Sequence, residues 1–243
     1  MTISDMALGI IAIDRAITQD INQLVGRAPM TDLFIFYLAD MDLLKGVLFM
    51  AVAWYLWFRG DAVVRTQVVN LLVIALLAVV VGRLLQLGLP ARLRPLDDPT
   101  LGLTLPAHVT PAVLRNWSSF PSDHATLFFA MAAALAPISR RLAWAAAAWA
   151  AVVICLPRLY LGFHYASDLI GGALIGAAVA LIYLHLPVQR FSQAVVRFAK
   201  RSPALFHAAG FVFTYEISSL MSNIRQLAMQ MLKLVHRVAS SGI

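Results

Sequence analysis

The sequence predicts an all-α fold, a polytopic membrane helical bundle of five or six transmembrane helices with amphipathic helices at the membrane surface. Of its 243 residues, 61% are hydrophobic and only 13% are charged, and the mean hydropathy is +0.80. A soluble domain is about half apolar and about a quarter charged. The apolar residues form long runs separated by short basic segments. We therefore expect an integral membrane protein with one membrane domain and no large soluble module.

The net charge of +7 bears on the kind of partner the protein binds, and the single cysteine bears on the disulfides and metal sites it can form. The basic residues are spread between apolar runs, which favours topology signals and contacts to anionic lipids over nucleic acid. A lone Cys155 excludes an intramolecular disulfide and a cysteine-based metal cluster. The N-terminus lacks the basic and apolar regions of a signal peptide, so we expect no cleaved leader.

Residues 1–29 predict an amphipathic helix that lies on the membrane and ends before Pro29. Apolar runs at 31–58, 68–89, 120–137, 142–156 and 168–186 predict five spans. The long polar loop between the second and third spans, residues 90–119, contains five prolines. In the first span, Asp42 and Lys45 are interpreted as a local ion pair at the interface.

After Pro187 the composition becomes basic and amphipathic. Residues 188–243 therefore predict a tail on an anionic leaflet, with a sixth span at 204–221 as the alternative. The predicted domains are an interfacial segment at 1–29, a membrane domain at 30–187 and this tail.

The basic residues predict the orientation of the protein in the membrane. If the five spans alternate in direction, eight basic residues fall on one side, and the positive-inside rule predicts that this side is cytoplasmic. These residues are Arg59, Arg65, Arg140, Arg141, Arg190, Arg197, Lys200 and Arg201. The unusual polar residues all fall at the opposite ends of the spans.

The segment from Pro157 to Asp168 carries three ionisable residues inside an otherwise apolar region. Such residues are costly in a membrane and indicate a functional site. If His164 and Asp168 share a helix, their spacing of four places them on one face, and the carboxylate would fix the tautomer of a nucleophilic histidine. Arg158 would bind a phosphate through its guanidinium. A satisfied polar contact at a helix end is the alternative interpretation.

Two other segments reach the same side of the membrane. One carries Arg92 and Arg94 at the end of the second predicted span. The other has Pro121, which favours a helix start, and the free N–H groups near Ser122, Asp123 and His124 would form an anion site. The convergence of three such segments on one surface predicts a phosphate-binding site there.

These motifs resemble the membrane branch of the type 2 phosphatidic acid phosphatase (PAP2) superfamily. That family carries Lys-x6-Arg-Pro, then Pro-Ser-Gly-His, then Ser-Arg-x5-His-x3-Asp, and residues 30–187 match this order. The resemblance implies that His164 attacks phosphorus and forms a phosphohistidine, that Asp168 orients it, and that His124 protonates the leaving oxygen. It also implies that Arg94, Arg158, Ser122 and backbone N–H groups hold the phosphate without a metal or other cofactor.

The chain departs from the family pattern at three positions. Leu87 stands where the family has Lys, Asp123 where Gly is usual, and Pro157 where Ser is usual. Arg92, or Arg83 one turn before Leu87, would replace the missing cation. The Ser-Phe-Pro-Ser-Asp-His form and the absent Lys are similar to bacterial undecaprenyl diphosphate phosphatases. The Leu-Pro-Arg form is similar to the lipid A phosphotransferases.

The leading prediction is a phosphatase that removes the terminal phosphate of undecaprenyl diphosphate at the outer face of a bacterial inner membrane. Its partners would be this lipid and the surrounding membrane lipids, with no nucleic acid. The alternatives are a phosphatase for phosphatidylglycerophosphate or phosphatidic acid, a phosphotransferase to an acceptor such as lipid A, and a non-enzymatic lipid-binding or transport protein with a relic site. Retention of both histidines and Asp168 argues against the last. Oligomeric state is left open. Asp97 and Asp98 are interpreted as solvated carboxylates rather than Mg²⁺ ligands.

Overall fold

The computed structural model describes residues 3–106, 109, 117–187, 189–222 and 230. Every regular element in these ranges is helical, which confirms the predicted all-α class. The α-helices are α1 (Ile3–Asn22), α2 (Pro29–Asp40), α3 (Gly46–Arg59), α4 (Ala62–Gly88), α5 (Asp123–Ala134), α6 (Arg140–Trp149), α7 (Leu156–Tyr160), α8 (Ala166–His185), α9 (Gln189–Arg201) and α10 (Pro203–Ser218). Short helical turns lie at η1 (Asp42–Leu44), η2 (Pro95–Asp97) and η3 (Pro99–Leu101), and a π-helical segment lies at η5 (Ala150–Cys155).

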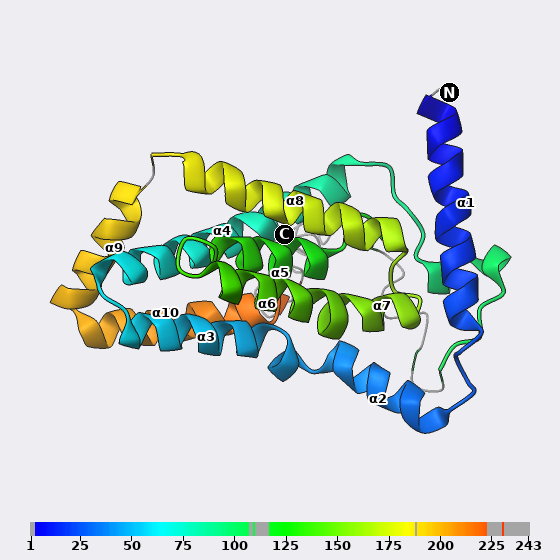
Figure 1. The fold of residues 1–243 in the computed structure, drawn as a ribbon, viewed down its shortest axis with the longest axis horizontal. Helices are drawn as coiled ribbons and strands as arrows, with labels where there is room; N and C mark the ends of the chain where they lie inside the picture. The colour runs from blue at the N-terminus through cyan, green and yellow to red at the C-terminus, as the bar shows by residue number, and fades with distance from the viewer. Residues whose placement is uncertain (1–2, 107–108, 110–116, 188, 223–229, 231–243) are drawn as a thin grey trace, which may run out of the picture.

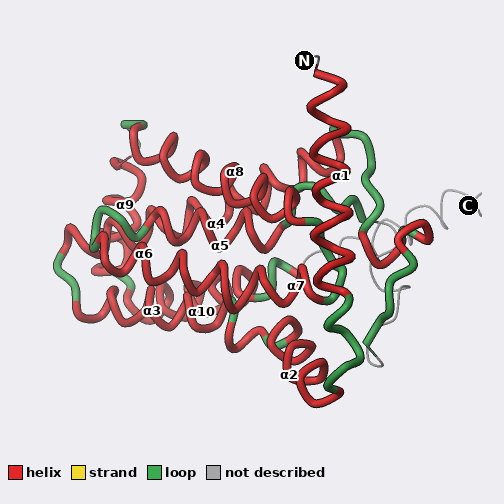
Figure 2. The backbone as a smooth tube through the Cα atoms, turned by 45° about the vertical axis from the view of Figure 1, so that its right-hand side comes forward, coloured by secondary structure: helices red, strands yellow, loops and turns green. Residues whose placement is uncertain are grey.

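The helices form an elongated bundle (Figure 1). Helices α3, α4, α5, α6, α8 and α10 run along its long axis, and α9 closes one end. At the other end α1 stands across the axis, and α2 lies beside the bundle (Figure 2). The bundle therefore has α9 at one end and α1 and α2 at the other.

Helix α5 is the centre of the packing. Its side chains Leu127, Phe128 and Met131 are fully buried. Its closest neighbour is α8, where a Cβ at Gly172 would lie 2.8 Å from a backbone oxygen of α5's cap and one at Gly176 only 2.1 Å from another. These two glycines let the backbones touch, because small residues allow membrane helices to approach closely. The contact holds the start of α5 against the start of α8.

Three helices are long and apolar enough to cross a membrane: α4, the continuous helix 140–160, and α8. They correspond to the predicted second, fourth and fifth spans. Helix α5 has 12 residues, about 18 Å at 1.5 Å per residue, and is enclosed by its neighbours rather than exposed to lipid.

The first predicted span is wrong as a single helix, because the chain breaks between Asp40 and Gly46 into α2 and α3. The Lys45 ammonium donates to the carbonyls of Ala39 and Asp40 at 3.0 and 2.8 Å. Carbonyls at a helix end need such partners, so Lys45 closes α2 and allows the change of direction. Helix α3 alone is a shorter apolar helix.

Pro157 lies inside the helix 140–160 without ending it. Proline has no N–H to donate, and the preceding segment Ala150–Cys155 is wound as a π-helix. The wider turn absorbs the missing hydrogen bond. Arg158 is thereby placed on the inner side of the helix, 4% exposed.

Helix α1 presents two faces. Asp14 and Thr18 are buried against the protein, whereas Leu8, Ile10 and Ile13 are exposed. Its direction across the bundle axis is the one expected of a helix on the membrane surface (Figure 1). The surface position itself stays a prediction.

The predicted C-terminal tail begins with two distinct helices. Helix α9 is amphipathic and buries Ser192, Val196 and Ala199. Helix α10 runs back along α3, as three contacts show. Trp57 contacts His207, and Trp54 contacts Thr214. A Cβ at Gly46 would meet Ser218. The segment proposed as a sixth span therefore packs on the bundle. The remainder of the tail beyond residue 222 lies outside the described residues, apart from residue 230.

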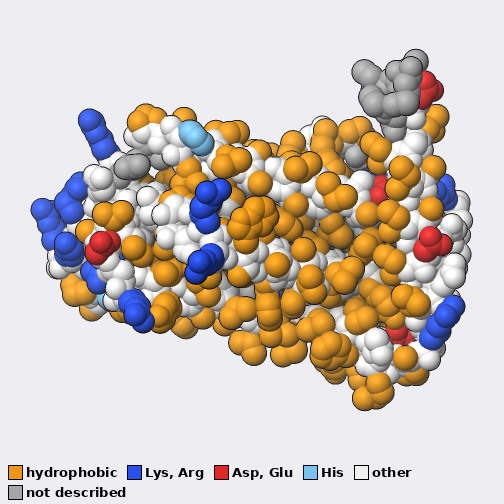
Figure 3. Space-filling view, in the orientation of Figure 1, with side chains coloured by type: hydrophobic (Ala, Val, Ile, Leu, Met, Phe, Trp, Pro, Cys, Tyr) orange, Lys and Arg blue, Asp and Glu red, His pale blue; other side chains and the backbone are white. Residues whose placement is uncertain are grey.

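Charge is distributed unevenly along the bundle. Lys and Arg side chains gather at the end formed by α9, whereas hydrophobic side chains cover most of the body (Figure 3). The α3–α4 and α5–α6 turns lie at that same end. The predicted grouping of basic residues on one side agrees with this arrangement.

Candidate active site

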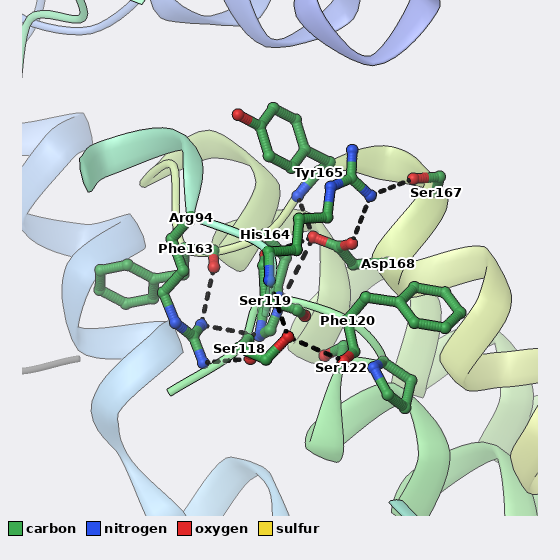
Figure 4. Close-up of polar contacts among 12 residues, drawn as sticks. Arg94, Ser118, Ser119, Phe120, Ser122, Phe163, His164, Tyr165, Ser167 and Asp168 are labelled. Carbon is green, nitrogen blue, oxygen red and sulfur yellow. Dashed lines mark hydrogen bonds and ion pairs between the residues drawn. The ribbon is translucent and has the colours of Figure 1, made fainter. Parts of the chain in front are cut away.

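The three motif segments meet at the end of the bundle opposite α9 (Figures 1 and 4). They are the loop after α4, the start of α5, and the turn between α7 and α8. Backbone hydrogen bonds tie them together: Ser119 donates to Arg92 at 2.9 Å, and Ser122 donates to Asp168 at 3.2 Å. The site is therefore built on paired backbone segments.

His164 lies two residues before α8 and is 4% exposed. Its Nδ1 is 2.9 Å from the carbonyl oxygen of Ser119. A carbonyl only accepts, so Nδ1 carries the proton and Nε2 carries the lone pair. That Nε2 is 3.2 Å from Nη1 of Arg94, a donor. The lone pair of His164 thus faces a cation suited to holding phosphate.

Asp168 is fully buried in the first turn of α8. Its Oδ2 accepts from the backbone N–H of Tyr165 at 2.8 Å and from the hydroxyl of Ser119. The same oxygen is 3.8 Å from Nδ1 of His164, an ion-pair distance rather than a hydrogen bond. The two side chains do not share a helix. Asp168 therefore acts on His164 through its charge and through Ser119, which contacts both.

The protonation state of His164 follows from its surroundings. Burial lowers the pKa of His164, and the charges of Arg94 and Arg158 act in the same direction. Asp168 opposes them by raising the pKa of the imidazole, but the net shift is downward. The imidazole is consequently neutral at neutral pH, which is the form that can attack phosphorus.

Arg94 is 5% exposed and projects into the site. Nη1 donates to the carbonyl oxygen of Phe163 at 2.8 Å, and Nη2 makes a long contact of 3.5 Å with that of Ser118. Its Nε is buried without a hydrogen-bond partner in the protein. Burial lowers the pKa of Arg94, but a guanidinium keeps its charge at any physiological pH. An unpaired buried donor on a charged group indicates a place for an anion.

Arg158 lies deeper and donates to two carbonyl oxygens, that of Ile154 at 2.7 Å and that of Ala39 at 3.1 Å. Lys45 shares the Ala39 carbonyl. The predicted local pair of Lys45 with Asp42 is present at 3.1 Å, but the Lys45 side chain is buried rather than interfacial. Two cations therefore lie next to each other behind the site.

The start of α5 carries the second motif. Ser122 is fully buried, and its hydroxyl accepts from the backbone N–H of Ala125 at 3.5 Å as an N-cap. His124 lies in the first turn, half-buried. The charges of Arg158, Lys45 and Arg94 act on His124. The predicted acid histidine thus lies among the cations of the site.

Asp123, which stands where the family has Gly, is paired. Its Oδ2 is 2.7 Å from Nη2 of Arg83, and its Oδ1 accepts from Gln86 at 2.8 Å. Gln86 also donates to the carbonyl oxygen of Pro121 at 2.8 Å. The Asp123 charge is thereby offset by Arg83, and α4 is tied to the start of α5.

The two positions considered for the missing Lys differ. Leu87, which stands at the position of the family Lys, is exposed. The Arg92 guanidinium contacts Asp168 and Asp14, each at 2.7 Å, and lies over the ring of Tyr165. Arg83 and Asp123 both act electrostatically on Arg94. The contacts of Arg92 favour a role in orienting Asp168, and those of Arg83 favour a role in offsetting the charge of Asp123 near Arg94.

Sequence reasoning did not identify Ser119, Asp14 or Lys45 as members of the site. Ser119 lies next to the second motif in the sequence, and this position could have identified it as a member of the site. Asp14 lies about 80 residues before Arg92 in the chain, and Lys45 precedes Arg158 by more than 100. Their contacts depend on how α1 and α2 pack, which local spacing does not encode.

Asp98, considered and set aside as an Mg²⁺ ligand, accepts from the backbone N–H of Thr100 at 3.0 Å and from its hydroxyl at 2.6 Å. Arg15 lies 3.7 Å away. The Thr100 hydroxyl is the main cause that lowers the pKa of Asp98. Within the described ranges, no three His, Cys, Asp or Glu side chains are grouped to hold a metal ion. Metal independence stays a prediction.

Comparison with known proteins identifies the family. No curated protein matches the sequence. Among solved structures, the chain is similar to the crystal structure of the first transmembrane PAP2 type phosphatidylglycerolphosphate phosphatase from Bacillus subtilis. The two share 19% identity with a TM-score of 0.49 over 72% of this chain and 85% of that one. The model of the PAP2 superfamily matches residues 67–192, just over half of the chain and the stretch that contains all three motifs. The protein is a membrane protein that belongs to the PAP2 superfamily, a membership that indicates a phosphatase.

Proposed function

We propose that the protein is a lipid phosphatase that removes the terminal phosphate of undecaprenyl diphosphate through a phosphohistidine on His164. The observation that carries this proposal is the orientation of the imidazole. Its Nδ1–H is directed to the Ser119 carbonyl, and its Nε2 faces Arg94. The buried, unpaired Nε of Arg94 supports an anion at the same place.

In the first step Nε2 of His164 attacks the terminal phosphorus. The Nε2–P bond forms as the bond to the bridging oxygen breaks, and protonated His124 gives its proton to that oxygen. The negative charge of the substrate offsets the positive charges around His124, so its imidazole can carry the proton. The products of this step are undecaprenyl phosphate and phosphohistidine.

In the second step neutral His124 takes a proton from water, and the water oxygen attacks phosphorus. The Nε2–P bond breaks, and inorganic phosphate leaves. Nδ1 keeps its proton throughout. Its bond to Ser119 and the charge of Asp168 stabilise the positive ring of the phosphohistidine.

In the proposed mechanism, arginines held in place stabilise the negative charge on the phosphate oxygens. Phosphoryl transfer depends on positioning and on stabilising charge spread over three oxygens. Arg94 and Arg158, held by backbone carbonyls, would supply that charge together with the N–H groups at the start of α5. The Ser122 hydroxyl caps the N-terminus of α5. The proposal requires no metal or other cofactor.

The choice of a diphosphate rests on the sequence resemblance and on the environment of Asp123. A carboxylate beside a phosphate site would repel substrate, but Asp123 is paired with Arg83 and Gln86. The Arg83–Asp123 pair is therefore close to neutral and does not oppose a substrate that carries more negative charge than a monoester.

The proposed location is a bacterial inner membrane with the site facing the periplasm. The basic end at α9 would then face the cytoplasm, in accordance with the positive-inside rule (Figure 3). Undecaprenyl diphosphate would reach the site from the outer leaflet.

Phosphate release from a panel of lipids tests the proposal. Pure protein is given undecaprenyl diphosphate, phosphatidylglycerophosphate and phosphatidic acid, with and without lipid A as acceptor, and the lipid products are analysed. The proposal expects the highest kcat/KM with undecaprenyl diphosphate and free phosphate as the product. Preference for a glycerolipid, or phosphate transfer to lipid A, would replace the proposed substrate or acceptor.

A further inference from the structure

Asp14 is a buried carboxylate that the proposed mechanism does not use. It belongs to α1, outside the residues that match the family model, and is only 2% exposed. Its Oδ2 is 2.7 Å from Nη2 of Arg92 and also accepts from the hydroxyl of Ser167. Its Oδ1 accepts from the backbone N–H of Ser167 at 2.9 Å. Both oxygens therefore contact the region that holds Asp168.

Arg92 connects Asp14 to the catalytic pair. Its Nη1 is 2.7 Å from Oδ1 of Asp168 and 2.8 Å from the hydroxyl of Ser167, while its Nη2 is directed to Asp14. The guanidinium also lies 4.2 Å over the ring of Tyr165. One cation is thus shared by two buried carboxylates.

The docking of α1 is specific. Asn22 exchanges two hydrogen bonds with the backbone of Thr104, at 2.7 and 2.8 Å. Arg15 contacts Thr100 and lies 3.7 Å from Asp98. Asp14 and Asn22 are eight residues apart, so they lie on the same face of the helix. This polar face is directed to the loop after α4, and its contacts hold Asp14 against Arg92.

We propose that Asp14 is a positioning residue that acts on His164 through Arg92 and Asp168, which makes the N-terminal helix a functional part of the active site. The inference rests on the proposed phosphatase function. Because Arg92 divides its donors between two carboxylates, Asp168 keeps more of its negative charge for the imidazole. Without the Asp14 charge, both sides of the guanidinium would turn to Asp168, and its effect on His164 would weaken.

Asp14→Asn removes the charge and keeps the size of the side chain. We expect kcat to fall about tenfold, the effect of one charge-assisted contact, with KM unchanged because Asp14 does not touch substrate. Asp14→Glu keeps the carboxylate and should recover part of the loss. Asp20→Asn is the matched control, since Asp20 is an exposed carboxylate on the same helix. It should behave as wild type.

A double-mutant cycle separates positioning from a merely structural role. If Asp14 acts through Arg92, kcat of the double variant Asp14→Asn/Arg92→Gln should equal that of Arg92→Gln alone. Additive losses accompanied by equal losses of thermal stability would overturn the inference, as would a kcat of Asp14→Asn equal to that of the Asp20→Asn control. If Asp14→Asn does not fold, the cycle is run with Asp14→Ser, which also removes the charge.

Failure of the inference is distinguishable from failure of the proposed function. An inactive wild-type protein, or an active His164→Ala variant, would reject the phosphatase mechanism itself. An active wild type with an inactive His164→Ala variant, together with Asp14→Asn that behaves as the control, would reject only the role of α1.

Discussion

Whether His164 can attack phosphorus depends on which ring nitrogen carries the proton. Ser119 fixes the proton on Nδ1 through its carbonyl and orients Asp168 through its hydroxyl. A single serine thus couples the proposed nucleophile to the carboxylate that would stabilise its charged form. The arrangement differs from a direct His–Asp hydrogen bond, because the two groups are 3.8 Å apart.

The lowered pKa of His164 predicts the acid limb of the pH–rate profile. Below its pKa the imidazole is protonated and has no lone pair, so the rate falls with falling pH. Since burial lowers the pKa, kcat/KM should stay high through neutral pH and fall only below the ordinary histidine value of about 6.5. Asp168→Asn removes the group that raises this pKa, so the residual activity should show the limb at still lower pH. An acid limb above the ordinary value would contradict this picture.

The different surroundings of Arg83 and Arg92 predict different substrate effects. Arg92 contacts Asp168, so Arg92→Gln should lower kcat on a polyprenyl diphosphate and on a lipid monophosphate alike. Arg83 is paired with Asp123 and acts on Arg94, so Arg83→Gln leaves a carboxylate uncompensated near the phosphate ligands. We expect it to lower kcat/KM on the diphosphate about tenfold more than on the monophosphate. Equal effects of Arg83→Gln on both substrates would exclude this role.

At the scale of helices, the close contact of α5 and α8 sets the site geometry. It brings the Ser122–His124 segment next to Asp168, and the Ser122 N–H donates to the Asp168 carbonyl at 3.2 Å. Gly172 and Gly176 permit this approach. The site is therefore sensitive to changes in helix packing one and two turns away.

Gly176→Ala should destabilise the protein. The added Cβ would lie 2.1 Å from the backbone oxygen of Thr126, so α5 and α8 would have to separate. We expect a loss of about 1–3 kcal/mol, the usual cost of overpacking. Gly9→Ala is the matched control, because a Cβ there meets nothing within 4 Å. Thermal unfolding in one detergent measures both; equal midpoints would contradict the predicted backbone contact.

Sequence patterns predicted some of these elements well. The run at 168–186 lies within two residues of both ends of α8, because a long apolar helix carries a strong signal. The run at 68–89 ends within one residue of the end of α4 but begins six residues after its start. The run at 31–58 was misread as one span, since its apolar composition hides the break that Lys45 stabilises. The contact of Asp14 with Arg92 depends on the docking of α1, which no local pattern reveals.

For the molecule as a whole, the ends differ in role. The end at α9 gathers basic side chains, and the opposite end holds the motif residues (Figures 1 and 3). The order of Arg94, His124, Arg158, His164 and Asp168 in the sequence was sufficient to predict that they converge. The contact of Asp14 with Arg92 and the placement of Lys45 beside Arg158 required the assembled bundle.

The proposed orientation predicts a labelling pattern in spheroplasts. Cys155 is buried, so the wild type gives a low background for a membrane-impermeant maleimide. Arg27→Cys, between α1 and α2 at the site end, should react from outside because that residue is exposed. Arg141→Cys, an exposed position at the other end, should react only after permeabilisation. The reverse pattern would place the site in the cytoplasm.

The most direct test of the central claim is to trap phosphate on His164. Pure protein is mixed with undecaprenyl diphosphate labelled in its terminal phosphate and quenched in alkaline denaturant, and the labelled peptide is sequenced by mass spectrometry. The account predicts a base-stable, acid-labile phosphate on His164 in the wild type. It predicts none in a folded His164→Ala variant, which should also be inactive because Nε2 of His164 is the nucleophile. Label on His124 instead, or turnover by His164→Ala near the wild-type rate, would contradict it.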